Sequence, residues 1–513
     1  MEDRGTVTVL TPTDQPGPAP ETPTHLSPPT AGAALADQLR AQLAPDRIIT
    51  DLTRLRTYEC DGITGYRVVP ALVALPESTD EVALVVAACA RAGVPYVARG
   101  AGTGLSGGAL PVADGVVISL ARMRRVLDVD LVNQRMTVEP GVTNSDITKA
   151  VAAHDLYFAP DPSSQTVCTI GGNIAENSGG AHCMKYGFTT NHVHAMTLVL
   201  PDASVVTVGG DGAEQVGPDL RGAVIGSEGT LAIATSVTVR LLRKPEAVRT
   251  LVADFASAEA AGEAVSGIIA AGIIPAAVEM LDALAIEACE AAVHAGYSLD
   301  TAAALVVELD GPTTECDEGF ARVEEICLEA GATHLRFAAD PDERMLIWKG
   351  RKAAFAAMGR ISPDYFVQDG VIPRTRLGEV LARMQVMADD AGLRVANVFH
   401  AGDGNLHPLV LYDAAVPGES ERGEHLSTAI AELCVEMGGS ITGEHGVGTD
   451  KACSMPKMFS EDDLAVMKRL RAAFDPDGIS NPGKIFPTPR LCGERPGPYR
   501  VHPLEAAGLI ERM

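Results

Sequence analysis

The sequence predicts an α+β protein built from more than one domain. A chain of 513 residues is longer than one ordinary hydrophobic core supports. An apolar segment at 71–76, a capped helical pattern at 78–93 and an apolar segment at 94–98 predict a strand–helix–strand unit. Between residue 248 and about 340, four apolar strand patterns alternate with Ala/Glu-rich helical patterns, which predicts an open antiparallel sheet covered by helices.

Short strands are expected next along the N-terminal part, at 115–123, 126–130 and 135–142, and then a capped helix at 143–156. Two more strands are expected at 195–202 and 204–208. The composition changes near Lys244 and Pro245, where we expect a linker between domains.

The composition excludes some classes of partner. The formal net charge of −26 repels nucleic acid and anionic membrane surfaces, so an anionic ligand needs a local basic pocket. The first thirty residues contain seven prolines and no basic region followed by an apolar core. This predicts a disordered leader, and a cytoplasmic protein with no transmembrane segment.

A glycine-rich loop, "RGAGTGLSGGALP" at 99–111, follows the strand–helix–strand unit. The glycines that match the dinucleotide pattern GxGxxG are Gly102, Gly104 and Gly107. That pattern requires a helix directly after it, and Gly108, Pro111 and Gly115 leave no room for one. The loop is therefore either a sharp turn or a bare backbone that binds a diphosphate through its N–H groups, with Arg99 adding charge.

Two further small-residue stretches, at 161–193 and 225–235, favour the second interpretation. Their candidate ligand-contacting residues include Gly171, Gly172, Asn173, Asn177, Gly179 and Gly180 in one, and Gly226, Glu228 and Gly229 in the other. Three loops that allow close backbone approach suit a large, extended ligand that carries phosphate.

Two histidines bracket the turn "HAGDGNLH" at 400–407. If Asp403 and Gly404 form a two-residue hairpin loop, His400 faces His407 with Cβ atoms about 5 Å apart, and both rings can reach one divalent ion. Glu444 of "TGEHGVG" is the candidate third ligand, with His445 beside it as a free base. Histidines with a structural or surface role are the alternative.

The segment "WKGRKAAFAAMGR", residues 348–360, is the candidate for the local basic pocket. Arg351 can bind a carboxylate through two parallel hydrogen bonds, which makes it the first candidate. The other candidates are Lys349, Lys352 and Arg360, and a solvated helix face is the alternative interpretation.

Taken in order, these motifs resemble flavoproteins of the vanillyl-alcohol oxidase type. The segments that carry the resemblance are "VARGAGTGLSGGALP", "DPSSQTVCTIGGNIAENSGG", "KYGFTTNHV", "GSEGTLAIAT", "FHAGDGNLH", "TGEHGVG" and "NPGKIF". Within that type the chain is most similar to FAD-binding subunits of bacterial glycolate oxidase, with D-lactate and D-2-hydroxyglutarate dehydrogenases as near relatives. The resemblance runs from about residue 35 to 487.

The resemblance implies a two-subdomain FAD-binding domain and an α+β cap domain with an antiparallel sheet. The expected divisions are a leader at 1–31, the FAD-binding domain at 32–245, the cap or substrate domain at 246–440, a segment returning to the flavin at 441–487, and a tail at 488–513. It implies noncovalent FAD, although His182 lies in a flavin loop and a histidine carries the flavin covalently in some members of the wider family.

The cofactor-binding residues implied are Arg99, Gly100, Gly102, Thr103, Gly104, Ser106, Gly107, Gly108, Asp161, Ser164, Thr169, Gly171, Gly172, Asn173, Asn177, Gly179, Gly180, Gly226, Glu228, Gly229, Ile233 and Asn481. The implied metal ligands are His400, His407 and Glu444, with zinc the first choice, and the catalytic residues are His445 and Arg351. Iron–sulfur and second flavin subunits are implied partners, through which the protein would contact a membrane peripherally.

The expected reaction is FAD-dependent oxidation of a small 2-hydroxy acid, glycolate or D-lactate, to the 2-keto acid. His445 would take the hydroxyl proton while a hydride passes to flavin N5. A 2-hydroxyglutarate-type dehydrogenase is an alternative, but the lysine expected about fifteen residues after Arg351 is replaced by Phe366 and Val367. A noncatalytic flavin subunit and a metal-dependent hydrolase are further alternatives.

Overall fold

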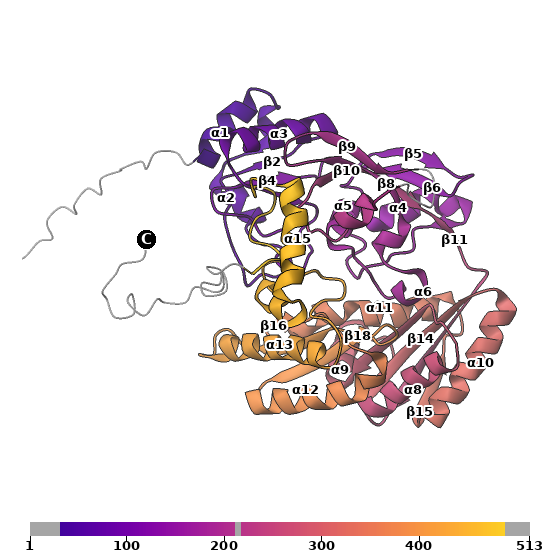
Figure 1. Ribbon diagram of the computed structural model, residues 1–513. Helices are drawn as coiled ribbons and strands as arrows, with labels where there is room; N and C mark the ends of the chain where they lie inside the picture. Colours follow the sequence, from indigo (N-terminus) through magenta and orange to yellow (C-terminus); the bar gives the residue numbers. More distant parts are fainter. Residues whose placement is uncertain (1–30, 211–216, 488–513) are drawn as a thin grey trace, which may run out of the picture.

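The computed structural model describes residues 31–210 and 217–487, so residues 1–30 of the expected leader and the expected tail at 488–513 lie outside the described residues. Its elements form an N-terminal part, through β11 (Leu242–Arg243), and a C-terminal part that begins with β12 (Ala247–Phe255). Figure 1 shows the two parts stacked on one another. The α+β class is confirmed, since both parts combine helices with sheets.

The N-terminal part begins with a four-stranded sheet in the order β1-β2-β4-β3. Its strands are β1 (Ile48–Ile49), β2 (Leu72–Ala74), β3 (Tyr96–Arg99) and β4 (Val116–Ser119), with α1 (Ala31–Arg40), α2 (Leu52–Leu55) and α3 (Thr79–Ala92) beside them. Helix α3 begins as predicted, because the Ser78 side chain accepts a hydrogen bond from the Glu81 N–H, and it ends at Gly93 with φ +63°. Strands β2, β4 and β3 are parallel.

An antiparallel five-stranded sheet follows, in the order β5-β6-β10-β8-β9. Its strands are β5 (Val126–Asp130), β6 (Arg135–Val138), β8 (Val193–Val199), β9 (Val205–Gly209) and β10 (Ile233–Arg240); β7 (Leu156–Tyr157) pairs with β11. The helices are α4 (Asn144–Val151), α5 (Ile170–Glu176), α6 (Cys183–Tyr186) and α7 (Leu220–Val224). Helix α5 was not expected, because Gly171 and Gly172 stand in its first turn.

The C-terminal part is built on a nine-stranded sheet. After β12 come β13 (Ala277–Asp282), β14 (Ala303–Gly311), β15 (Ala332–Phe337), β16 (Asp364–Val367), β17 (Gly370–Val371), β18 (Arg394–His400), β19 (Asn405–Leu406) and β20 (Pro408–Tyr412). One face packs against α8 (Ala258–Ala270), α10 (Thr313–Glu329), α12 (Leu377–Ala391) and α13 (Glu419–Glu436). The other face packs against α9 (Ala283–Val293) and α11 (Pro341–Ala357).

Strand periodicity places three polar residues on the α9/α11 face of this sheet. Alternate side chains of a strand share a face, and Val306 and Val398 belong to the core on that face. Glu308 lies two residues after Val306, and His400 lies two residues after Val398. Glu279 pairs directly with His400 across β13 and β18, so it shares the same face.

The last described segment returns to the N-terminal part. It contains α14 (Met455–Met458) and α15 (Glu461–Phe474), and Figure 1 shows α15 running beside both parts. Ser480 forms a bridge with Tyr96 of β3, and the Thr449 N–H donates to the Ser106 carbonyl. Among the described residues, no helix is both long enough and apolar enough to cross a membrane.

Candidate active site

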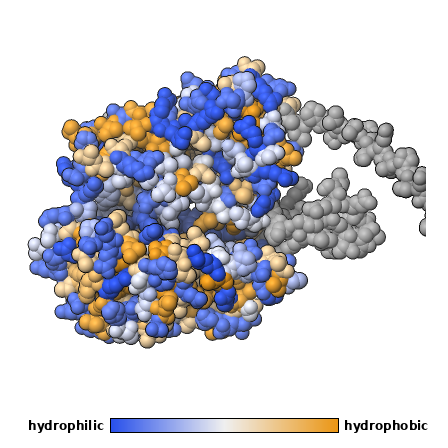
Figure 2. Space-filling model, turned by 180° about the vertical axis from the view of Figure 1, so that it is seen from behind, coloured by the Kyte–Doolittle hydropathy of each residue, from blue (hydrophilic) through white to orange (hydrophobic). Residues whose placement is uncertain are grey.

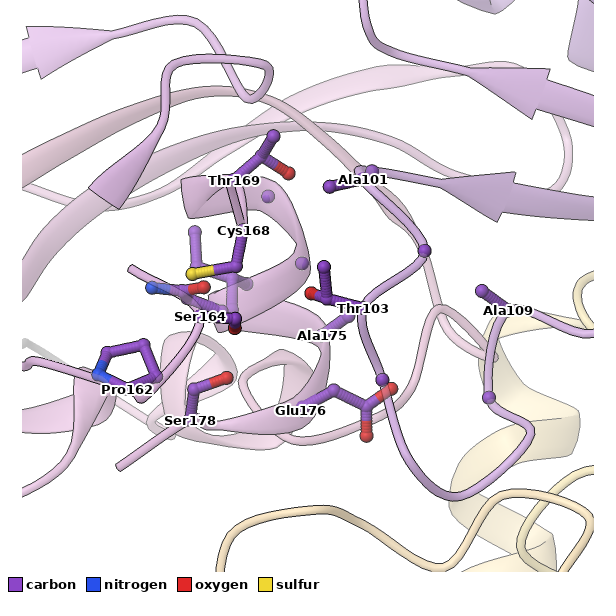
Figure 3. Close-up of a pocket in the computed structure, with 18 of the residues that line it drawn as sticks. Ala101, Thr103, Ala109, Pro162, Ser164, Cys168, Thr169, Ala175, Glu176 and Ser178 are labelled. Atoms are coloured by element: carbon purple, nitrogen blue, oxygen red, sulfur yellow. The ribbon is translucent and has the colours of Figure 1, made fainter. Parts of the chain in front are cut away.

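A cavity of about 370 Å³ lies where the three small-residue loops meet the C-terminal part. Figure 2 shows a recess between the two parts of the molecule, and Figure 3 looks into the cavity between the loop that carries Thr103 and the segment that carries Thr169. Many of the residues predicted to contact the cofactor line this cavity. They are Arg99, Gly100, Gly102, Thr103, Gly104, Gly108, Ser164, Thr169, Gly171, Gly172, Asn173, Glu228, Gly229 and Ile233.

The cavity lining contains polar groups that a ligand could satisfy. The Thr169 hydroxyl and the Asn173 side-chain amide nitrogen are buried at the cavity wall and have no hydrogen-bond partner. Such atoms cost free energy unless a ligand or water satisfies them. Gly104 leaves its backbone open, since an added Cβ would meet no atom closer than 4.0 Å. The loop that carries Gly104 contains no helix, as its glycine and proline spacing predicted.

The other predicted cofactor residues do not line the cavity; they are Ser106, Gly107, Asp161, Asn177, Gly179, Gly180, Gly226 and Asn481. Asn481 instead ties two loops together, because its side-chain amide donates to the carbonyls of Gly108 at 2.9 Å and Glu228 at 2.6 Å. The Glu228 carboxylate in turn accepts from the backbone N–H groups of Val447 at 2.7 Å and Gly448 at 2.8 Å. These contacts bring the "TGEHGVG" segment to the cavity.

His182 lies outside the cavity lining, between Asp161 of the N-terminal part and Glu308 of the C-terminal part. Its Nδ1 lies 2.9 Å from Asp161 Oδ2, and its Nε2 lies 3.2 Å from Glu308 Oε1. Although burial opposes the charged ring, these two carboxylates raise the pKa of His182 to about 10. Both ring nitrogens of His182 are therefore engaged by carboxylates.

The structure brings the three candidate metal ligands together. His400 Nε2 and His407 Nε2 lie 3.3 Å and 3.5 Å from Glu444 Oε1, and one donor atom from each residue lies within 4.8 Å of the others. His407 is buried, and neither of its ring nitrogens makes a well-formed hydrogen bond. Two imidazoles and a carboxylate at these separations fit a divalent ion bound at about 2.1 Å.

The predicted register of the histidine hairpin was wrong. His400 pairs with Asn405, and Asn397 pairs with Pro408, so the loop holds four residues rather than two. His407 is therefore a diagonal neighbour of His400 on the same face, and the ring centroids still lie 5.1 Å apart. The pairing of β18 with β13 and of β19 with β17 selects this register.

His445 lines the cavity beside the metal candidates. Its ring stacks on that of His407, with centroids 4.9 Å apart and planes at 3°, and its Nδ1 has no hydrogen-bond partner. Burial, together with the neighbouring His407, lowers the pKa of His445 to about 4 despite the opposing charge of Asp369.

Sequence reasoning missed two buried acids behind these residues. Asp369 Oδ2 accepts hydrogen bonds from the Thr442 hydroxyl at 2.6 Å and from the N–H groups of Gly443 and His445 at 2.9 and 2.8 Å. Glu279 Oε1 lies 2.7 Å from His400 Nδ1 and orients that ring. The sequence does contain a signal for Glu279, because it is an acid inside the apolar strand pattern "AAVEML". A buried acid requires a buried partner.

Arg351 does not occupy the expected place. Its side chain is 2% exposed, it lies outside the cavity lining, and its guanidinium is 2.5 Å from Glu279 Oε2. Lys352, the next residue, turns toward the cavity and lines it, whereas Lys349 and Arg360 are exposed. Successive positions of a helix point about 100° apart, so the two neighbouring cations of α11 serve different sites.

Comparisons with known proteins agree with this architecture. Residues 70–209 match the model of an FAD binding domain, and residues 244–485 match that of the C-terminal domain of FAD linked oxidases. The glycolate oxidase subunit GlcD of Escherichia coli strain K12 is 51% identical over 445 residues, which cover 87% of this chain and 89% of that protein. GlcD of Bacillus subtilis is 38% identical over 84% of this chain and 92% of that protein.

More distant proteins share the fold. The mitochondrial D-lactate dehydrogenase [cytochrome] of Arabidopsis thaliana is 30% identical over 83% of this chain and 74% of that protein. A solved structure of p-cresol methylhydroxylase with substrate bound superposes with a TM-score of 0.74 at 17% identity, covering 89% of this chain and 96% of that one. The 4-ethylphenol oxidase of Gulosibacter chungangensis also gives a TM-score of 0.74, at 19% identity, over 92% and 100% of the chains.

Proposed function

This chain belongs to the FAD-linked oxidases, and on that premise we propose that it oxidises a small 2-hydroxy acid, glycolate or D-lactate, to the corresponding 2-keto acid. Relatives that match most of the chain carry the names glycolate oxidase subunit, at 51% and 38% identity, and D-lactate dehydrogenase, at 30% identity. The observation that carries the proposal is one cavity that joins the glycine loops to His407, Glu444 and His445.

FAD would bind noncovalently along the three loops, against Arg99, Thr169, Asn173 and the glycines that line the cavity. Bound FAD would supply the two-electron acceptor for the hydride of the substrate's α-carbon. The loop glycines would let the backbone N–H groups approach the ligand closely, and Arg99 also lines the cavity. Asn481 and Glu228 act indirectly, since they hold the loops against the "TGEHGVG" segment.

His400, His407 and Glu444 would hold a divalent ion, with zinc the first choice for two imidazoles and a carboxylate. Such an ion would lower the pKa of the substrate hydroxyl. His445 would accept the hydroxyl proton, because it lines the cavity and its Nδ1 is unpartnered. Glu279 would keep the His400 ring oriented through its 2.7 Å contact to Nδ1.

A 2-hydroxyglutarate-type enzyme is less well supported. Such a substrate carries a second carboxylate, and Phe366, which occupies one of the two positions considered for a second cation, stacks on Tyr412 at 4.7 Å. A noncatalytic flavin subunit would not need His445 unpartnered at the cavity wall. A metal-dependent hydrolase would leave the cavity between the glycine loops without a role.

We also propose that the protein works with partner subunits that carry electrons onward, since the GlcD relatives are named as subunits. The chain contains no CxxC pair with which to build an iron–sulfur centre of its own. Such partners would supply that centre and a second flavin. They would also bring a cytoplasmic protein to the membrane surface.

Anaerobic mixing tests the proposal directly. Purified holoenzyme is mixed with glycolate, D-lactate, L-lactate and 2-hydroxyglutarate, and absorbance at the flavin band is followed with time. We expect glycolate or D-lactate to bleach the flavin fastest. A flavin that no hydroxy acid reduces would refute the proposed reaction and favour the noncatalytic subunit.

A further inference from the structure

Five charged side chains meet where α11 approaches the cavity, and they join the two parts of the molecule. His182 contacts Asp161 at 2.9 Å and Glu308 at 3.2 Å. Arg344 donates to both oxygens of Glu308, at 2.8 and 2.6 Å. Lys352 Nζ lies 3.4 Å from Asp161 Oδ2. The nearby Lys185 and Asp310 pair with one another.

This cluster carries one positive charge in excess. Both ring nitrogens of His182 face carboxylate oxygens, which only accept, so both must donate and the ring is a cation. Three cations therefore face the two carboxylates of Asp161 and Glu308. In a chain with a net charge of −26, such an excess marks a place where an anion is stabilised.

The excess charge resides on Lys352. Glu308 is saturated, because the Thr250 hydroxyl and the Trp348 indole also donate to it, at 2.6 and 2.7 Å. Lys352 has only the long contact to Asp161, whose Oδ2 it shares with His182, and a position 5.8 Å from the Trp348 ring. An ammonium group has three donors, so Lys352 retains donors for a further acceptor.

The position of Lys352 matches that of a substrate-binding group. Lys352, Phe355 and Ala356 lie on one face of α11 and line the same cavity as His407 and His445. Arg99, the last residue of β3, is the other Lys or Arg residue that lines this cavity among the described residues. Arg351 is already paired with the buried Glu279.

We propose that Lys352 binds the carboxylate of the substrate, a small monocarboxylic 2-hydroxy acid. This inference rests on the proposed function for the identity of the acid. Asp161 acts as a positioning residue, because its carboxylate contacts the Lys352 ammonium group, and His182 in turn holds Asp161. A second carboxylate finds no further cation of the C-terminal part in the described lining, which restricts the substrate to a monoacid.

The test compares Lys352→Met with Lys352→Arg and with Lys349→Met, which removes a lysine from the exposed side of the same helix. The first readout is equilibrium binding of acetate to the oxidised holoenzyme, followed by the perturbation of flavin absorbance. Loss of a hydrogen-bonded charge pair should weaken acetate binding at least about tenfold in Lys352→Met. Lys352→Arg and Lys349→Met should stay within about threefold of the wild type.

The second readout is anaerobic flavin reduction by glycolate and D-lactate. In Lys352→Met, the half-saturating concentration should rise at least about tenfold while the limiting rate changes less, which a general structural defect would not produce. Unchanged acetate affinity in Lys352→Met, or an equal loss in Lys349→Met, overturns the inference. If the wild type binds acetate through Lys352 but no acid reduces its flavin, the proposed function fails and the inference about Lys352 stands.

Discussion

The buried pair of Glu279 and Arg351 allows a quantitative test of why Arg351 does not serve the substrate. Glu279 is 0% and Arg351 2% exposed, and their charged atoms lie 2.5 Å apart. The perturbation is Glu279→Gln, which removes the charge but retains an oxygen that can accept from His400 Nδ1. The Arg351 cation is then left buried and uncompensated.

The expected cost follows from that isolation. Removing one partner of a fully buried ion pair destabilises a protein by about 3–5 kcal/mol. The family model of the C-terminal part spans residues 244–485, and for a domain of this size 1 kcal/mol corresponds to roughly 2 °C in melting temperature, so we expect a decrease of roughly 6–10 °C. Adding Arg351→Met removes the stranded cation and should restore most of that loss.

The measurement is thermal and urea unfolding of the wild type, Glu279→Gln, Arg351→Met and the double variant. Glu379→Gln is the matched control. Glu379 pairs with Arg376 on the surface, where both side chains are about half exposed, so its loss should cost no more than about 0.5 kcal/mol. If the loss of unfolding free energy in the double variant equals the sum of the losses in the two single variants, Glu279 does not neutralise Arg351 and the reasoning fails.

Substitutions of His445, His407 and His182 each have an expected effect that can be measured. His445→Ala should keep the yellow flavin spectrum but slow anaerobic bleaching by about 10²–10⁴-fold, and normal bleaching would exclude His445 as the base. His407→Ala should lower the bound divalent metal measured by elemental analysis, and equal metal content in both proteins would argue against the site. The pKa of His182 is raised from 6.5 to about 10 by Asp161 and Glu308 against the effect of burial, so its stabilisation is complete below pH 6.5 and declines as the pH rises to about 10. The melting temperature should therefore fall more steeply between pH 7 and 10 in the wild type than in His182→Gln, and parallel profiles would contradict this role.

Local patterns predicted much of the fold. The caps at Ser78 and Gly93 gave the bounds of α3 within a residue, because these residues act on the backbone next to them. The four apolar patterns after residue 248 formed strands of one antiparallel sheet. The ordered glycine motifs indicated the family, which the sequence relatives confirm.

Contacts between residues far apart in the sequence account for the features that the sequence patterns did not predict. The hairpin register depends on β13 and β17, which local turn chemistry at Asp403 and Gly404 does not reveal. The placement of Arg351 depends on Glu279, 72 residues earlier in the chain, and the role of Asp369 depends on a loop more than seventy residues later. Helix α5 forms despite two glycines, because packing of Ile170 and Ile174 into the core outweighs weak helix propensity.

The bridge made by Asn481 between Gly108 and Glu228 has a consequence for how the protein matures. Its bonds span 373 and 253 positions of the chain, so these loops are fastened only after residue 481 has been synthesised. Contacts of such long range form slowly. We therefore expect the nascent chain to capture its flavin only after the segment around residue 481 has left the ribosome.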